Sequence, residues 1–378
     1  MLESLNLKKE AFGLDVSDLS LKIAKLRKGG SHLKLDSFGS MNIDPGLIKQ
    51  GEITDEKRVA EIIKASLKNV YGKKIKTKYV IAALPEEKAF LQVIRMPKLS
   101  KEDLGSAIAY EAENYIPMPI NDVYLDSRIL PAMRNCKTEG QEVLLAAIPR
   151  KVADGYLSCL KKAGLEPIAF EIESQAISRA LIKNDNANEP IAMLDLGESR
   201  TIFIVFYGNS IRFTASIPIS GYLFRKIVAQ DLGVDMDKAE TLITRYGIRE
   251  RMKIKIQNET DPSPETKLVK GEIFQALIPA LVDLVQQIKK YMDFYQTHSC
   301  QDAPANETKK ISKIILCGGG ANLKGIDGLL SLELRTPVEI GNPWVNIMGE
   351  KDIPDISSEK SLKYATVLGL AIRTLEEK

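Results

Sequence analysis

The chain has 378 residues, 44% hydrophobic and 27% charged, and its 53 Lys and Arg against 50 Asp and Glu leave a formal net charge of +3. This length allows two or three domains, and the nearly balanced charge argues against a nucleic-acid partner, which would require a clustered basic surface. Because the four cysteines are scattered and no apolar run approaches the ~20 residues of a membrane span, we expect a cytoplasmic protein without a zinc site or disulfide framework.

The first segment is predicted to form an antiparallel three-stranded meander. Residues 11–16 are an apolar run, residues 20–27 alternate in polarity, and a third strand continues from Leu33 after a glycine turn. A helix is expected at 56–72, closed by Gly72, and a buried strand follows at 78–84. Residues 1–84 are therefore interpreted as the N-terminal part of a first α/β domain.

The next segment, residues 85–165, differs in character and predicts an inserted α/β subdomain. Its first helix is stopped by Pro117 and Pro119, and a strand and a second helix follow. Residues 166–189 then return to the first domain through a strand and a helix.

A second meander follows, which predicts a second domain over 190–345 with a helical subdomain at about 220–268. A polar loop is expected at 255–267. A long helix at 272–298 carries an apolar face, and Pro279 is expected to kink it or to mark a late start. Residues 346–378 are expected to contain a C-terminal helix that packs on the first domain. The apolar face of the long helix comprises Ile273, Leu277, Leu281, Leu284 and Ile288.

The chain contains one turn twice, in "GLDVSDLSLKIAKL" and in "AMLDLGESRTIFIVF". Each copy has a strand ending in an aspartate, a short turn and a second strand, and the two aspartates, Asp15 and Asp195, lie 180 residues apart. A single such turn is more often only a turn. Paired turns indicate an internal duplication, in which two similar α/β domains face a cleft.

The duplicated turns have the chemistry of a phosphate site. Successive backbone N–H groups in a turn attract an anion, to which Ser20 and Thr201 add hydroxyl donors and Lys22 adds a positive charge. Asp15 and Asp195, opposed across a cleft, suit a hydrated magnesium ion. A third motif allows a flat adenosine group to approach the backbone, at Gly318, Gly319 and Gly320.

These stretches resemble the two phosphate motifs and the adenosine motif of the actin-like ATPase superfamily. The inserted stretch "AIAYEAENYIPMPINDVYLDSRIL" and the following "EVLLAAIPRKVADGYLSCLKKAGLEPIAFEIES" are similar to the insertion of the PilM family of type IV pilus assembly proteins, which is related to FtsA. The similarity runs from about residue 11 to 375. It implies an actin-like (ribonuclease H-like) two-domain α/β fold with a duplicated core and an inserted subdomain of the FtsA/PilM type.

The resemblance also implies ligands and a partner. ATP and Mg²⁺ are expected in the interdomain cleft, with Asp15 and Asp195 toward the metal. The short N-terminal peptide of the membrane protein PilN is the expected partner, and it would bring this cytoplasmic protein to the inner membrane. The residues expected to bind the nucleotide are Asp15, Ser17, Ser20, Lys22, Asp195, Gly197, Thr201, Gly221, Gly318, Gly319, Gly320 and Asn322.

Four departures from the family pattern predict weakened or lost ATP binding and at most a slow ATPase. Ser17 stands where glycine is usual, Asp18 where a small serine-like residue is usual, Ser220 in place of a second glycine, and Ile243 in place of a lysine. The Asp18 carboxylate would repel a triphosphate. A water for hydrolysis would be placed by a polar residue of the linking segment, and Glu171, Glu173 and Gln175 stay open for this role, as does a simple helix N-terminal role.

Two other functions stay open. A small-molecule kinase of the same superfold needs a second substrate pocket with an acid–base group, and none stands out. An FtsA-like filament former or membrane tether is expected to carry a basic amphipathic helix beyond the folded domain, whereas this sequence ends in "GLAIRTLEEK". The partner peptide is expected to contact the insertion and the first domain, near Tyr115, Ile116 and Met118, which are equally consistent with an ordinary core.

Overall fold

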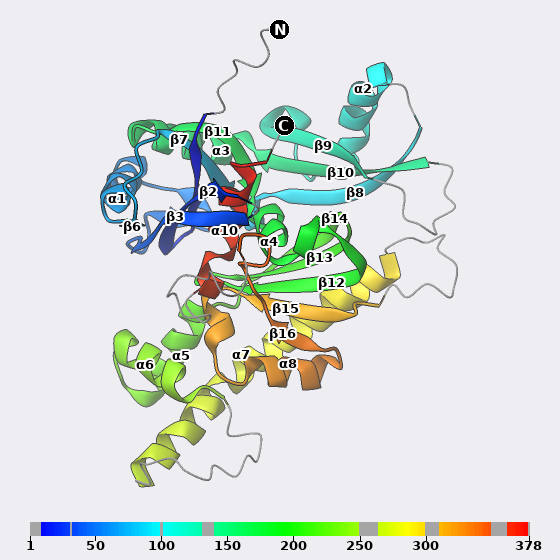
Figure 1. Cartoon of the computed structure of the whole chain (residues 1–378). Coiled ribbons are helices and arrows are strands. Elements are labelled where there is room, and N and C mark those ends of the chain that lie inside the picture. The colour runs from blue at the N-terminus through cyan, green and yellow to red at the C-terminus, as the bar shows by residue number, and fades with distance from the viewer. Residues whose placement is uncertain are drawn as a thin grey trace.

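The computed structural model of the protein describes residues 9–30, 32–98, 101–130, 140–248, 264–298, 310–348 and 361–376. Most of the loop expected at 255–267 lies outside the described residues. The chain forms a mixed α/β structure with two large sheets, one above the other in Figure 1, and a smaller third sheet. The predicted duplicated two-domain fold is confirmed by the matching order of the strands in the two large sheets, described below.

The first half of the molecule is built on a six-stranded sheet in the order β11-β7-β1-β2-β3-β6. The predicted meander of β1, β2 and β3 is antiparallel, and β7 and β11 add parallel strands on the other side of β1. Gly72, expected to close the first helix, lies in β6 instead. The strands are β1 (Ala11–Val16), β2 (Ser20–Gly29), β3 (His32–Asn42), β6 (Tyr71–Gly72), β7 (Tyr79–Leu84) and β11 (Glu166–Ile172), with a short hairpin of β4 (Ile48–Lys49) and β5 (Glu52–Ile53).

Two pairs of helices cover the faces of this sheet. Because side chains alternate along a strand, Phe12 and Leu14 of β1 face a core that includes α1 (Glu56–Lys68) and α3 (Arg150–Lys162). The opposite face is covered by α4 (Glu173–Leu181) and α10 (Ala365–Arg373). The C-terminal helix therefore packs on the first half of the molecule.

The insertion is a separate antiparallel sheet in the order β8-β10-β9, with α2 (Lys101–Ala112) beside it. Its strands are β8 (Phe90–Pro97), β9 (Val123–Leu130) and β10 (Gly140–Pro149). Sequence analysis identified β10 but not β8 or β9, whose polarity does not alternate clearly. Because α3 packs on α1 in the core of the first half, we propose that the insertion ends near Pro149 rather than at residue 165.

The second half repeats the architecture in a five-stranded sheet, β14-β13-β12-β15-β16. Strands β12, β13 and β14 form the second antiparallel meander, and β15 and β16 are parallel to β12, as β7 and β11 are to β1. The strands are β12 (Ala187–Leu196), β13 (Thr201–Gly208), β14 (Ser210–Ile217), β15 (Lys313–Cys317) and β16 (Val338–Ile340). The helices are α5 (Gly221–Leu232), α6 (Met236–Tyr246), α7 (Pro264–His298) and α8 (Ile326–Leu334).

Helix α7 differs from the sequence expectation at its start. It begins at Pro264, so residues 264–267 are helical rather than part of a loop, and Pro279 lies inside the helix instead of marking its start. The predicted apolar face is confirmed, since its members are at most 3% exposed. Those members are Ile273, Leu277, Leu281, Leu284 and Ile288.

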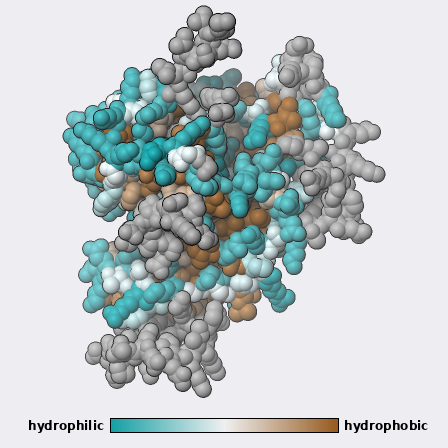
Figure 2. Space-filling model, in the orientation of Figure 1, coloured by the Kyte–Doolittle hydropathy of each residue, from teal (hydrophilic) through white to brown (hydrophobic). Residues whose placement is uncertain are grey.

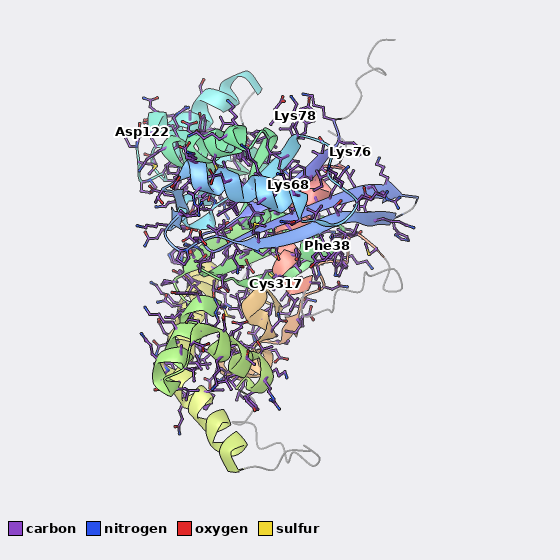
Figure 3. All side chains as sticks on the ribbon, turned by 90° about the vertical axis from the view of Figure 1, so that its left-hand side faces the viewer. Phe38, Lys68, Lys76, Lys78, Asp122 and Cys317 are labelled. Atoms are coloured by element: carbon purple, nitrogen blue, oxygen red, sulfur yellow. The ribbon has the colours of Figure 1, made fainter. Side chains whose placement is uncertain are left out.

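The two halves are stacked with apolar residues between them. Figure 2 shows apolar side chains gathered across the middle of one face, where the halves meet, and hydrophilic residues over most of the remaining coloured surface. In the side view of Figure 3, Phe38 marks the first sheet and Cys317, at the end of β15, lies below it in the second.

Candidate functional site

A cavity of about 960 Å³ lies between the two halves. The β1–β2 turn lines it from the first half, and the β12–β13 turn, the glycine turn after β15 and parts of α5 and α6 line it from the second half. Every residue expected at the nucleotide site lines this cavity except Thr201. The Thr201 hydroxyl is buried and donates a hydrogen bond to the Ile219 carbonyl at 2.7 Å, so this side chain holds the fold instead of facing the cleft.

The two turns are equivalent in length and strand register. Val16 pairs with Leu21 in the first hairpin, and Leu196 pairs with Thr201 in the second. In the first turn, the Ser17 N–H and hydroxyl both donate to the Ser20 carbonyl, at 2.9 and 3.1 Å. The first turn is therefore closed by its own polar groups.

The second turn is held by the start of α5. The Gly221 N–H donates to the Gly197 carbonyl at 3.0 Å, and the Tyr222 N–H donates to the Glu198 carbonyl at 3.1 Å. These N–H groups at the helix N-terminus are engaged by the protein. Gly221 therefore contributes close approach of the backbone rather than a free donor for an anion.

Both aspartates act on one lysine, Lys22. Lys22 donates to Asp15 Oδ2 at 3.2 Å and to the Ser20 hydroxyl at 3.0 Å. Burial lowers the pKa of Lys22, but the carboxylates of Asp15, Asp195 and Glu173 outweigh burial and leave its pKa above the usual value. Burial raises the pKa of Asp195 to about 6, with Lys22 opposing this shift and Asp15 adding to it. The equivalent aspartates of the two halves therefore share one electrostatic environment.

This arrangement fits a hydrated divalent cation. Asp15 is only 3% exposed, and its Oδ1 atom has no hydrogen-bond partner among the described residues. A buried carboxylate oxygen without a partner is costly, and a hard cation with its waters would satisfy it. Carboxylate oxygens are also the ligands that Mg²⁺ prefers.

The glycine turn after β15 is shaped by close contact with the second hairpin. Gly318 has a φ of 81°, and a Cβ there would lie 2.3 Å from Asp195 Oδ1. Gly320 also approaches closely, since its Cβ would lie 3.0 Å from the Leu196 side chain. Only glycine fits at Gly318, so this turn can present its backbone directly beside Asp195.

Ion pairs that the sequence did not predict surround the cleft. Arg200 of the second turn lies 3.6 Å from Asp18 of the first turn and 2.5 Å from Glu87, which belongs to the short 3₁₀ turn η2 (Glu86–Lys88). In the second half, Arg225 donates to Glu198 and Glu240, at 3.0 and 2.9 Å. Arg200 stands inside the quoted second motif, but no local pattern reveals that its partners lie in the other half.

The structure selects among the three polar residues of the linking segment. Glu173, the first residue of α4, lines the cleft, whereas Gln175 lines another cavity and Glu171 forms ion pairs with Arg179 and Arg373. Glu173 accepts a hydrogen bond from the Glu86 N–H at 2.9 Å. Burial, with Asp15 and Glu87 nearby, raises the pKa of Glu173 well above its usual value.

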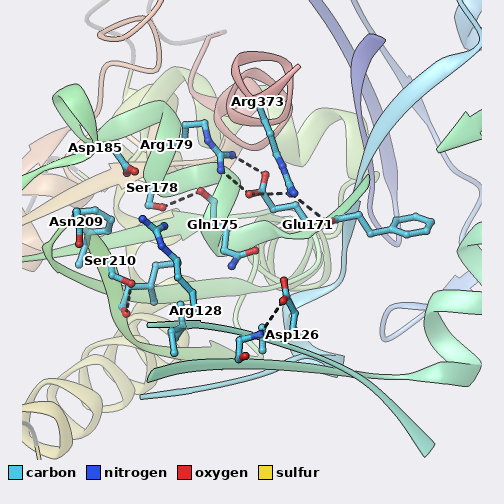
Figure 4. A pocket seen from close by; sticks show the side chains of 16 residues that line it. Asp126, Arg128, Glu171, Gln175, Ser178, Arg179, Asp185, Asn209, Ser210 and Arg373 are labelled. Carbon is cyan, nitrogen blue, oxygen red and sulfur yellow. Dashed lines mark hydrogen bonds and ion pairs between the residues drawn. The ribbon is translucent and has the colours of Figure 1, made fainter. Parts of the chain in front are cut away.

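A second cavity of about 250 Å³ lies where the insertion, the first half and the β13–β14 turn meet. Figure 4 shows Arg128 extending from β9 toward α4, and Glu171 held by Arg179 and Arg373 on the far wall. Within the described chain, no ion pair joins Arg128 to the other residues of this lining. Ile116 is buried in the core of the insertion, whereas Tyr115 and Met118 are exposed.

Comparisons with known proteins agree with this geometry. The family model described as type IV pilus assembly protein PilM matches residues 13–375. A solved PilM-PilN type IV pilus biogenesis complex is similar in structure, with a TM-score of 0.79, 25% sequence identity, and coverage of 98% of this chain and 100% of that one. MreB 5 of Spiroplasma citri bound to AMPPNP shares the fold, with a TM-score of 0.54 and 12% identity over 97% of this chain and 96% of its own.

The curated relatives are cell division proteins. FtsA of Buchnera aphidicola is 22% identical over 239 residues, which cover 61% of this chain and 54% of the relative. The chain thus spans about half the length of the curated relatives it matches. In the parts of the chain that the structure describes, no helix has the length and apolarity needed to cross a bilayer.

Proposed function

The chain belongs to the family of type IV pilus assembly protein PilM, and from this premise we propose that it is an actin-like scaffold for assembly of a pilus or a related secretion machine. It binds a magnesium nucleotide in the cleft and the cytoplasmic N-terminal peptide of a PilN-like membrane protein. The observation that carries the nucleotide part is the meeting of Asp15 and Asp195, from equivalent turns, in one cavity. The solved PilM-PilN complex supports the partner.

The nucleotide would be held by groups of both halves. Asp15 and Asp195 would bind the waters of Mg²⁺, which supplies the charge that neutralises the phosphates. The two turns would line the phosphates with Lys22 beside them. The adenosine would lie against Gly318, Gly319 and Gly320, with Asn322 nearby.

The proposed role is binding rather than rapid hydrolysis. A general base must accept a proton from water at working pH. Glu173 is the residue of the linking segment that lines the cleft, and its raised pKa means that it keeps its own proton to higher pH than an ordinary glutamate. We infer slow hydrolysis from Asp18 and Ile243, which line the cleft where the family pattern has a small residue and a lysine, and the bound nucleotide would mainly bias how the two halves close.

We place the partner peptide at the second cavity, where the insertion meets the first half. Arg128 and the Glu171–Arg179 pair give this cavity polar groups that can bind the backbone of an extended peptide. The exposed Tyr115 and Met118 define the competing location. Binding at either place would bring the protein to the cytoplasmic face of the inner membrane through its partner, without a nucleic-acid contact.

A peptide-binding experiment tests this function. A fluorescent peptide with the N-terminal sequence of the PilN-like protein should bind the full chain, and its affinity should change when magnesium and ATP are added. Arg128→Glu should weaken binding about tenfold or more through lost and repelling polar contacts, while Arg128→Lys and Tyr115→Ala should stay near the wild-type value. If Tyr115→Ala abolishes binding and Arg128→Glu does not, the peptide lies at the Tyr115 surface. Absence of binding in every protein would refute the partner.

A further inference from the structure

An ion-pair bridge joins the two turns across the cleft. It consists of Arg200 from the second turn and of Asp18 and Glu87 from the first half, whose side chains are all at most 16% exposed. The contact between Arg200 and Glu87, at 2.5 Å, is an ion pair without the alignment of a hydrogen bond. All three residues line the cavity assigned above to the nucleotide.

The bridge is fixed on its acidic side. Asp18 accepts hydrogen bonds from the N–H groups of Gln50 and Gly51, both at 2.9 Å, so its carboxylate cannot swing away without losing two partners. Gly51 packs against η2: a Cβ added to Gly51 would lie 2.7 Å from Glu87 Oε1. One guanidinium therefore faces two carboxylates, of which Asp18 is anchored by two hydrogen bonds.

The bridge lies where the phosphate chain would end. The glycine turn contacts Asp195, and Asp15, paired with Lys22, lines the same cavity. Asp18 follows Asp15 by three residues, at the tip of the same turn. A nucleotide whose adenosine occupies the glycine turn would direct its phosphates past the two aspartates toward Arg200.

We propose that Asp18 holds the position of a terminal phosphate in the nucleotide-free protein and that Arg200 is the residue by which the cleft distinguishes a nucleoside triphosphate from a diphosphate. This inference rests on the proposed nucleotide site. A triphosphate must compete with Asp18 for Arg200 and approach a fixed carboxylate of like charge, whereas a diphosphate stops short of both. The wild-type chain therefore binds the diphosphate more tightly than the triphosphate.

The two sides of the bridge give opposite expectations, which separates this proposal from a purely structural role. Asp18→Asn removes the anchored carboxylate that repels the terminal phosphate and leaves Arg200 paired with Glu87 alone, so affinity for the triphosphate should rise about tenfold relative to the diphosphate. Arg200→Ala removes the cation and leaves both carboxylates, so the same ratio should fall about tenfold. If the bridge only held the halves together, both variants would break it and shift the two affinities in the same direction.

The experiment is calorimetric titration of the full chain with magnesium AMPPNP and magnesium ADP. Asp36→Asn is the matched control, because Asp36 forms ion pairs with Arg27 and Lys73, both at 3.0 Å, outside the cavity lining. Its ratio should equal that of the wild type. Equal ratios in Asp18→Asn, Arg200→Ala and wild type, with ADP still bound, would overturn this inference alone. Absence of any nucleotide binding in all four proteins would overturn the nucleotide part of the proposed function and this inference with it.

Discussion

The β1–β2 and β12–β13 turns have the same length and strand register but form ion pairs with different parts of the molecule. Asp18 and Glu198 occupy equivalent positions, each three residues after the aspartate of its strand, and each pairs with an arginine. The arginine of Asp18 comes from the other half, whereas Arg225, the partner of Glu198, comes from α5 of the same half. The first turn therefore forms an ion pair across the cleft, whereas the second turn forms the equivalent ion pair within its own half.

The helices that cover the two sheets also differ, in how closely their backbones approach what they pack against. The second sheet is covered by the long apolar face of α7, which packs on it through its side chains. The first sheet is covered by α10 and α4, which approach so closely that a Cβ on Gly369 would lie 1.8 Å from the Ala176 carbonyl oxygen. Because this contact is between two backbones, no flexible side chain can move aside to make room for a Cβ.

The largest expected effect therefore concerns the cover of the first half. Gly369→Ala should lower the free energy of unfolding by about 3 kcal/mol, because α10 must move away from α4. Gly155→Ala in α3 is the matched control: apart from the neighbouring backbone of its own helix, no described atom lies within 4 Å of its added Cβ, so this substitution should stabilise the protein by about 0.5 kcal/mol. Urea denaturation measures both, and a Gly369→Ala variant as stable as wild type would contradict the close packing.

The equivalent aspartates offer the next comparison. Asp15→Asn should weaken binding of a magnesium nucleotide about thirtyfold, or about 2 kcal/mol, because Asp15 supplies both the partner of Lys22 and the unpartnered Oδ1. Asp195→Asn should weaken it about tenfold. Titration with and without EDTA checks both. Full magnesium dependence in either variant would show that its aspartate is not a ligand of the metal's water shell.

The two hairpins also differ at the residue that follows the turn, which is Leu21 in the first and Thr201 in the second. Thr201→Val should cost about 1–2 kcal/mol of stability, because the buried Ile219 carbonyl loses its donor. Nucleotide affinity should stay unchanged. Chemical denaturation and calorimetric titration together decide: weaker nucleotide binding at full stability would restore Thr201 to the site that the sequence predicted for it.

The smallest expected effect is a dependence on pH. The pKa of Asp195 is raised to about 6 by burial, and that of Glu87 to about 7, also by burial, with Arg200 opposing it. A carboxyl with a raised pKa binds its proton more tightly in the folded state. The stability that this binding contributes is full below pH 4 and is lost as the pH rises through 6 and 7.

Asp195→Asn should therefore flatten the decline of unfolding free energy between pH 4 and 7 by about 1 kcal/mol for each pH unit. Urea denaturation at several pH values measures the difference from wild type, and Asp36→Asn serves as the control outside the cleft. An unchanged slope in Asp195→Asn would mean that the Asp195 carboxyl is more solvated than its burial indicates.

Local patterns carried much of what sequence analysis recovered. The meanders, the apolar face of α7 and the duplicated turns follow from spacing within short segments, and these patterns persist wherever the segment packs. The same is true of the glycine turn, since Gly318 is required by a backbone conformation that other residues rarely adopt. Strands β8 and β9 lacked such a pattern, and so did the start of α7.

Only the tertiary structure decided which side chains meet. The sequence placed Asp18 and Arg200 in two similar turns, but their ion pair exists because two sheets stack and bring those turns together. The same stacking places Glu173, and not Glu171 or Gln175, in the lining of the cleft. The hydroxyl of Thr201 donates to the Ile219 carbonyl and therefore does not face the cleft. The sequence by itself determined the local elements and the repeated turn, because these depend on neighbours along the chain. The charges that face one another across the cleft depend on contacts between residues far apart in the chain, which no local spacing encodes.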